Sequence, residues 1–526
     1  MRWRSRFGLF CLCLCLVLAI QWRGAAFRGE FGGSADEPAH YITGLMVHDY
    51  LAAGLPSGPL EYARSYYRHY PKVALGHWPP LFYVVQAVWE LVFGPSRVSL
   101  MILMAVIAAA LATVLCDWAS REYSLGAGIC LAVLLVTHPA IAEYSRMVMA
   151  ETLMALLVLL AVLAWGSYLE TERWQAAAWF GLWSTLALLT KGTGIALALV
   201  PPLSVLLSRR WRLVSRFSFW LPAIPVVAFA GPWYLLAPDA QHESVARFGG
   251  LQFIGSRILG TLAGWQRMLG VVPVLAGMAG MLLWGIRIRR GAPGARWLAG
   301  ACILASAYIC RLLVGAWEER HLLTTLPVLF MFAWAPVAWL FSVPLKSLHQ
   351  RMKSILAGAV TTVVAAANIY ALPPTPQFGF AEVAQHLASS APLRDEVFLI
   401  CSDASGEGMF ISEVAMREKR PGHVILRASK VLASMDFMGW RYRSLFDGQE
   451  SVLRYLESVP VGIVIIDDAA RERPHGNLLA KSMRDHPEKW ELELRYPPSR
   501  PASRQYGEIL VYRSAGLPPP LTRRSE

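Results

Sequence analysis

The sequence contains the polar stretch GEFGGSADEPAHYITGLMVHDYLAAG (residues 29–54), followed by GHWPPLFYVVQAVWE (residues 76–90), and both lie between strongly apolar segments. An acidic pair, Asp36 and Glu37, comes soon after the first apolar segment, and a His-Trp-Pro-Pro turn begins at His77. A polar loop that joins apolar runs of membrane-spanning length is expected to lie at a membrane surface.

The composition is that of a membrane protein. The 526 residues are 55% hydrophobic and only 16% charged, and the mean hydropathy is +0.42, whereas soluble domains have about 25% charged residues. The net charge is +13, but the positive residues cluster in short loops between apolar runs. This pattern orients membrane proteins, so we expect no nucleic-acid partner. The eight cysteines show no disulfide framework and no CxxC metal site.

Apolar runs of about 20 residues predict membrane-spanning helices. We therefore predict a polytopic α-helical membrane protein with about eleven transmembrane helices. The expected spans are 7–23, 96–116, 124–142, 147–168, 175–190, 193–208, 217–236, 267–286, 297–316, 321–342 and 353–372. The basic N-terminus resembles a signal peptide, but bulky residues follow its apolar run, and we interpret it as a retained signal anchor.

The loop charges indicate the orientation. Predicted inner loops carry many basic residues, whereas the short predicted outer loops carry few, and this asymmetry sets topology during insertion. The inner basic residues are Arg209, Arg210, Arg212, Arg216, Arg287, Arg289, Arg290, Arg296, Lys346, Arg351 and Lys353. The prediction is an N-inside, C-outside topology, with the external parts being the loop 24–95 and the C-terminal tail.

The chain is expected to have two domains. Residues 1–375 form the membrane domain, in which two amphipathic runs of the loop 24–95 are predicted to be interfacial helices. Residues 376–526, after a Pro-rich linker, alternate short apolar runs with helical patterns. This alternation predicts an extracytoplasmic α/β domain, and its Arg-rich end is predicted to be disordered.

Ionisable residues at the outer ends of the expected spans are the candidate site. Charged groups within apolar spans are costly and often mark function, and a transporter would place them near the midplane instead. The candidates are Asp36, Glu37, His77, Arg146, Glu151, Lys191, Glu319 and Arg320.

Each candidate also has a purely structural explanation. Asp36 suits a helix N-cap, and the His77 turn suits an interfacial tryptophan anchor. Arg146 suits a snorkelling side chain, with Glu151 as a solvated first-turn acid. Lys191 also suits a turn between two spans. The Glu-Glu-Arg run at 318–320 suits a rim of charges at a helix start.

The combination suits chemistry on a lipid-linked sugar. A sugar phosphate on a polyprenyl lipid presents an anionic phosphate at the bilayer surface, next to a reactive anomeric carbon. A transferase needs a carboxylate that deprotonates the acceptor hydroxyl and cations that hold the leaving phosphate. Asp36 is the candidate base, and Arg146, Lys191 and Arg320 are the candidate phosphate ligands.

Five motifs in this order resemble the membrane glycosyltransferases of the GT-C superfold. The chain is most similar to the dolichyl-phosphate-mannose protein mannosyltransferases and their bacterial aminoarabinose transferase relatives, over roughly residues 1–345. The motifs are Asp36-Glu37, Pro79-Pro80-Leu81-Phe82-Tyr83, Arg146 to Glu151, Leu189-Thr190-Lys191-Gly192 and Glu319-Arg320-His321-Leu322.

The resemblance implies that Asp36 is the general base, supported by Glu37. It implies that one sugar moves with inversion from a polyprenyl-phosphate donor to an acceptor on the outer face of a bacterial inner or plasma membrane. The acceptor, a protein, lipid or envelope glycan, stays open. Two departures from the family pattern are His77-Trp78 in place of a lysine before Pro-Pro, and Glu151 in place of an aspartate.

Other interpretations remain. A polyprenyl-linked lipid or saccharide transporter would show polar groups through the membrane depth and repeat symmetry, and a receptor would leave the outer-face charges unexplained. Asp36, Glu37, His77 and Glu151 offer oxygen and imidazole ligands for a divalent ion. No ligand spacing supports such a site, so we expect no metal and no cofactor, with membrane lipids as further partners.

Overall fold

The computed structural model describes residues 3–237, 251–289, 294–313, 318–343, 349–389, 396–434, 442–497 and 507–516. The chain forms two compact units. The first contains Met1–Gly24, Gly76–Phe82 and Met101–Pro373, and the second contains Ala25–Leu75, Tyr83–Leu100 and Pro374–Glu526. Most of the loop 24–95, which the sequence-based division assigned to the membrane domain, thus groups by its packing with the C-terminal residues.

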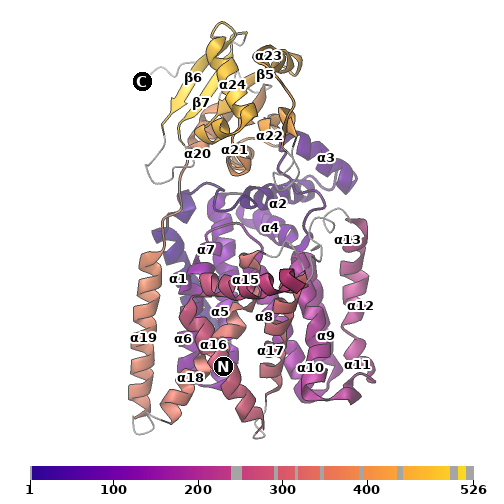
Figure 1. The fold of residues 1–526 in the computed structure, drawn as a ribbon, viewed down its shortest axis with the longest axis vertical. Helices are drawn as coiled ribbons and strands as arrows, with labels where there is room; N and C mark the ends of the chain where they lie inside the picture. The colour runs from indigo at the N-terminus through magenta and orange to yellow at the C-terminus, as the bar shows by residue number, and fades with distance from the viewer. Residues whose placement is uncertain are drawn as a thin grey trace. The chain divides into compact units, whose positions relative to one another are not determined.

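The first unit is a bundle of helices (Figure 1). Its α-helices are α1 (Trp3–Arg23), α5 (Arg97–Glu122, shared with the second unit), α6 (Leu125–Thr137), α7 (Pro139–Tyr144), α8 (Glu151–Thr171), α9 (Trp174–Thr190), α10 (Val200–Ser208), α11 (Phe217–Trp220), α12 (Ala223–Pro225), α13 (Gly231–Leu236), α15 (Leu251–Leu269), α16 (Val271–Arg289), α17 (Ala295–Leu313), α18 (Leu326–Ser342) and α19 (Gln350–Ala371). Two 3₁₀ segments, η2 (Gly192–Leu199) and η5 (Glu319–Thr325), precede α10 and α18.

Among the described residues, seven helices are long and apolar enough to cross a membrane, or eight if the bent pair α15–α16 is one span. Each of the eleven expected segments overlaps a helical segment, but several are short or broken. The expected span 124–142 is a 13-residue helix that ends before His138, and 193–208 begins as a 3₁₀ helix. The count of eleven and the N-inside orientation therefore stay predictions.

The bend between α15 and α16 was not expected. The two helices meet at an angle of 115°, and α15 lies across the other helices of the bundle (Figure 1). Gly270 joins them with φ of +83°, a left-handed conformation that glycine adopts without a steric cost. A glycine such as Gly270 does not change the helical spacing of the apolar residues before and after it. The sequence pattern therefore does not reveal that the helix axis changes direction there.

The close packing of α16 against α18 requires glycine at two positions of α16. A Cβ atom on Gly280 would overlap the main-chain carbonyl oxygen of Phe332, which is fully buried. A Cβ atom on Gly277, about one turn earlier, would lie 2.3 Å from a side-chain carbon of Leu329. Small residues allow helices to approach closely in a membrane, where dispersion contacts drive their association.

The second unit combines the loop with a small sheet domain. The loop contributes α2 (Glu37–Ala52), α3 (Pro59–His69) and most of α4 (Leu81–Phe93). The C-terminal residues form α20 (Phe380–Ala388), β1 (Val397–Cys401), α21 (Ala404–Arg417), β2 (Ile425–Arg427), α22 (Ala428–Val431), β3 (Ala433–Ser434), β4 (Arg443–Ser444), α23 (Gln449–Ser458), β5 (Val461–Ile466), α24 (Pro474–Asp485), β6 (Trp490–Tyr496) and β7 (Ile509–Ser514).

The C-terminal sheet confirms the predicted α/β architecture. Its five strands have the order β2-β1-β5-β7-β6. The first three are parallel, and β7 and β6 are antiparallel to their neighbours. The core around β1 and β5 includes the buried side chains of Leu399, Val464, Leu453 and Leu479. Burial on both faces explains why β5 is apolar without alternation.

Buried charged groups connect the loop to the C-terminal residues within the second unit. Glu30 accepts hydrogen bonds from the N–H groups of Phe378, Gly379 and Ala381, at 2.5, 3.0 and 2.7 Å. Burial raises the pKa of Glu30 to about 7, although these N–H donors oppose the shift. Asp49 of α2 also forms an ion pair with Arg420, at 2.7 Å. These contacts fix α2 against the sheet domain.

We expect Gly280→Ala to destabilise the protein by about 1–3 kcal/mol, because α16 and α18 must separate to admit the methyl group. Gly285→Ala on the same helix is the matched control, since a Cβ atom added there would have no atom within 4 Å, and alanine favours a helix by about 1 kcal/mol over glycine. Thermal unfolding of the detergent-purified variants measures both effects. Equal midpoints for the two variants would contradict the close contact.

Candidate functional site

A buried cluster of three charged side chains lies at the start of α8. Lys191 Nζ donates a hydrogen bond to Glu151 Oε1 at 2.5 Å, and Arg320 Nε lies 3.6 Å from the same oxygen. The Glu151 side chain is 1% exposed, and those of Lys191 and Arg320 are 9% and 13% exposed. Among these three side chains, one carboxylate thus faces two cations.

Breaks in helical structure position the three side chains. Glu151 is the first residue of α8, and Lys191 has an extended backbone between the end of α9 and the start of η2. Arg320 is in the first turn of η5, which Glu318 and His321 stabilise by a reciprocal capping box. Arg320 Nε also pairs with the more exposed Glu318 at 2.8 Å. All three charged residues thus lie at the start or the end of a helical segment.

The acidic pair of the loop belongs to the second unit. Asp36 occupies the N-cap position of α2, but its side chain makes no capping hydrogen bond, and the residue is partly exposed. Glu37 is fully buried; it accepts a hydrogen bond from the Gly33 N–H at 2.9 Å and pairs with Arg97 at 3.4 Å. The geometry therefore argues against helix capping as the role of the Asp36 side chain. The contacts of Glu37 with Gly33 and Arg97 give that residue a structural role.

The sequence analysis did not single out Lys72 or Arg97, which both lie close to this acidic pair. Lys72 Nζ donates to the Ala404 carbonyl at 2.9 Å, and the Lys72 stem lies beside Gly408, as does Pro38. Burial, together with Arg427, lowers the pKa of Lys72 to about 7, while Asp36 is among the carboxylates that oppose the shift. A lysine in a polar run has no distinctive sequence signal.

The other predicted site residues make separate contacts. Arg146 is buried and donates to the Pro373 carbonyl at 2.7 Å, just beyond α19. Glu319 is 40% exposed and pairs with Arg267 of α15. The partly exposed His77 ring contacts Trp78 edge-on, with centroids 4.6 Å apart. The structure thus brings Glu151, Lys191 and Arg320 together and gives the remaining candidates of the first unit other partners.

No group of three His, Cys, Asp or Glu side chains within the described ranges is arranged to hold a metal ion. At Glu151, two cations lie beside the buried carboxylate and would repel a metal ion. The expectation of no cofactor stays a prediction.

The overall fold is shared with solved membrane enzymes. ArnT from Cupriavidus metallidurans, in its crystal structure bound to undecaprenyl phosphate, matches 98% of this chain over 99% of its own length, with a TM-score of 0.57 and 14% identity. The apo oligosaccharyltransferase of Archaeoglobus fulgidus matches 99% of this chain over 76% of its own, with a TM-score of 0.55 and 13% identity.

A third structure is archaeal AglB from Archaeoglobus fulgidus, in complex with an inhibitory peptide and a dolichol-phosphate. It matches 88% of this chain over 69% of its own length, with a TM-score of 0.50 and 12% identity. A search of curated proteins gives no significant sequence match. The chain is therefore an integral membrane protein with the fold of the GT-C glycosyltransferases, as the motifs indicated.

The family comparison is more specific. Residues 77–235 match the family model described as dolichyl-phosphate-mannose-protein mannosyltransferase. The matched part begins at His77 and includes Arg146, Glu151 and Lys191. The family match is thus to mannosyltransferases over part of the chain, and the fold over nearly the whole chain is that of GT-C proteins.

We expect Glu151→Ala to destabilise the protein by about 3–5 kcal/mol, because it leaves Lys191 and Arg320 buried without their shared carboxylate. Glu318→Ala removes a 59% exposed partner of the same arginine and should cost under about 1 kcal/mol. Thermal unfolding in detergent compares the two variants. If Glu318→Ala lowered the thermal stability as much as Glu151→Ala, burial would not determine how much each carboxylate contributes to stability.

Proposed function

We propose that the protein transfers a single hexosyl or pentosyl unit from a polyprenyl-phosphate donor to a hydroxyl acceptor on the outer face of the membrane. Asp36 is the general base, and Lys191 and Arg320 hold the donor phosphate. The acceptor hydroxyl belongs to a protein, a lipid or an envelope glycan.

The buried cluster of Glu151, Lys191 and Arg320 carries this proposal. Its two cations, Lys191 and Arg320, suit a phosphate, and the cluster lies at the end of a membrane-length helix. In the same fold, the ArnT structure is bound to undecaprenyl phosphate and the AglB structure is in complex with a dolichol-phosphate. Both ligands are prenyl phosphates, the product that remains when such a donor loses its sugar.

The charge change during transfer explains why two cations are useful. The donor is a phosphodiester with one negative charge. When the bond between the anomeric carbon and the phosphate oxygen breaks, the electron pair stays on that oxygen, and the polyprenyl phosphate gains a second negative charge. Cations that are already in place stabilise this developing charge without reorganisation. Before the donor binds, Glu151 and the more exposed Glu318 offset the positive charges of Lys191 and Arg320.

The base completes the reaction. The acceptor oxygen forms the new bond to the anomeric carbon while its proton moves to Asp36. In a single displacement from the opposite face, the anomeric configuration inverts. Two features support Asp36 in this role: the residue is partly exposed, and its side chain makes no capping hydrogen bond to α2. Glu37 holds the preceding loop through Gly33 and Arg97 and thus positions the base.

Asp36→Asn should reduce the transfer rate by at least about 100-fold, because the amide keeps the shape of the side chain but cannot accept the proton. Purified protein is given a panel of radiolabelled polyprenyl-phosphate sugars, with a membrane extract as acceptor. Glu61→Gln, an exposed substitution on α3 of the same loop, is the control and should transfer normally. Normal turnover of the Asn variant would disprove the assignment, and no transfer by folded wild-type protein would favour the transporter.

Lys191→Ala should raise the donor KM by about 10- to 100-fold, since a hydrogen bond to a charged group contributes about 1.5–3 kcal/mol. Lys191→Arg keeps the charge and should recover most of the affinity. The acceptor KM is measured alongside and should not change. An unchanged donor KM in a folded Ala variant would show that Lys191 serves only as a structural partner of Glu151.

A further inference from the structure

A second polar site lies at the other end of α8. A cavity of about 610 Å³ is lined by residues of α5, α8, α9 and α17 and of the turn between α8 and α9. Its volume falls in the range of about 300–1,000 Å³ that is typical of small-molecule sites. Glu151 begins α8, and the pocket residues Ser167 and Thr171 are near its end, about 24–30 Å away along the helix axis.

The pocket wall along α8 changes from apolar to polar. Leu160, Leu163 and Ala164 line it nearer the middle of the helix, and Ser167 and Thr171 line it at the end. Spacings of three and four residues place these side chains on one helix face. The wall thus suits an amphiphile whose apolar part points toward the membrane centre. A fully polar solute would leave the leucines in contact with water.

Arginines supply the positive charge of the pocket. Arg121, Arg173 and Arg296 line it, together with one acid, Asp117, which already pairs with Arg6 and Arg121. Arg296 pairs with the partly exposed Glu170. Within the described part of the chain, no carboxylate forms an ion pair with the Arg173 guanidinium. The close approach of α17 to Gly166, whose Cβ would lie 2.7 Å from the Arg296 Cα, places Arg296 at the pocket.

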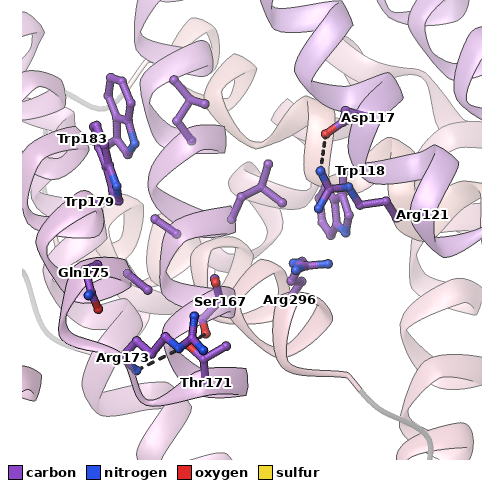
Figure 2. Close-up of a pocket in the computed structure, with 14 residues that line it drawn as sticks. Asp117, Trp118, Arg121, Ser167, Thr171, Arg173, Gln175, Trp179, Trp183 and Arg296 are labelled. Atoms are coloured by element: carbon purple, nitrogen blue, oxygen red, sulfur yellow. Dashed lines mark hydrogen bonds and ion pairs between the residues drawn. The ribbon is translucent and has the colours of Figure 1, made fainter. Parts of the chain in front are cut away.

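Tryptophans indicate the position of the pocket relative to the membrane. Trp179 and Trp183 of α9 stack with centroids 5.7 Å apart, and Trp179 is 53% exposed. Figure 2 shows this pair on one side of the pocket and Trp118, Arg121 and Arg296 on the opposite side. Tryptophan concentrates at the membrane–water interface, where the phosphates of bilayer lipids lie. In the predicted topology this is the cytoplasmic interface.

We propose that this pocket binds one anionic glycerophospholipid of the bilayer. Arg121, Arg173 and Arg296 hold its head-group phosphate, and an acyl chain lies along Leu160 and Leu163. Basic pockets between transmembrane helices are known to bind anionic head groups. The site is separate from the cluster at Glu151, so the inference does not depend on the proposed transferase reaction.

Native mass spectrometry of the purified protein tests the proposal, with phosphatidylglycerol or phosphatidylcholine added at equal concentration. Wild-type protein should retain one phosphatidylglycerol at least tenfold more strongly than phosphatidylcholine. Arg173→Gln/Arg296→Gln should lose this preference. Arg209→Gln/Arg212→Gln removes the same charge from an exposed loop outside the pocket and should keep the preference, as should Lys191→Ala at the other end of α8.

A second variant keeps the test decisive if the double arginine variant does not fold. Ala164→Phe fills the pocket without changing its charge and should also abolish the retained lipid. Equal retention of the two lipids by wild-type protein would overturn the proposal. Retention that Ala164→Phe leaves unchanged, or that falls equally in the Arg209/Arg212 control, would place the bound lipid elsewhere and overturn it as well.

Discussion

A carboxylate in a membrane domain has to be neutralised within the protein, and at Glu151 this requirement organises the bundle. The idealised cost of moving an ion into a medium of low dielectric is of order 20 kcal/mol, so Glu151 is stable in its charged form only where Lys191 and Arg320 reach it. Those two residues lie on different helical segments, the end of α9 and the start of η5. Their ion pairs therefore fix where α9 and α18 lie against α8.

The membrane class and the approximate helix positions could be predicted because they depend on local composition. An apolar run of sufficient length has few alternatives to a helix in lipid, since its backbone groups need internal partners. The directions of the helices depend instead on single residues. The helix direction changes by 115° at Gly270, which lies between apolar residues. The helix α6 ends before His138, which precedes Pro139 and is therefore disfavoured in a helical conformation. A sequence profile reports how apolar a segment is but does not report whether it is straight.

For the candidate site, too, local sequence predicted some features and not others. Sequence reasoning found Glu151, Lys191 and Arg320 because a charge beside an apolar run is costly and therefore informative. It did not predict which charges pair. Arg146, five residues before Glu151, contacts the Pro373 carbonyl, and Glu319, next to Arg320, pairs with Arg267. Lys72 gave no signal, since a lysine in a polar loop is ordinary. Its proximity to the N-terminus of α2 depends on packing in the second unit that no local pattern encodes.

The two ends of α8 differ in how their positive charge is compensated, and this difference suits two kinds of ligand. At Glu151, a buried carboxylate offsets part of the charge of two cations. Such a site suits a phosphate whose charge increases during a reaction, because it does not hold the less charged donor or the more charged product too tightly. At the other end the arginines exceed the acids, and Arg173 is partnered by no carboxylate among the described residues. That excess suits a ligand of constant charge that stays bound. If both proposals hold, the two ends of α8 bind two different phosphates, that of the sugar donor and that of a bilayer lipid.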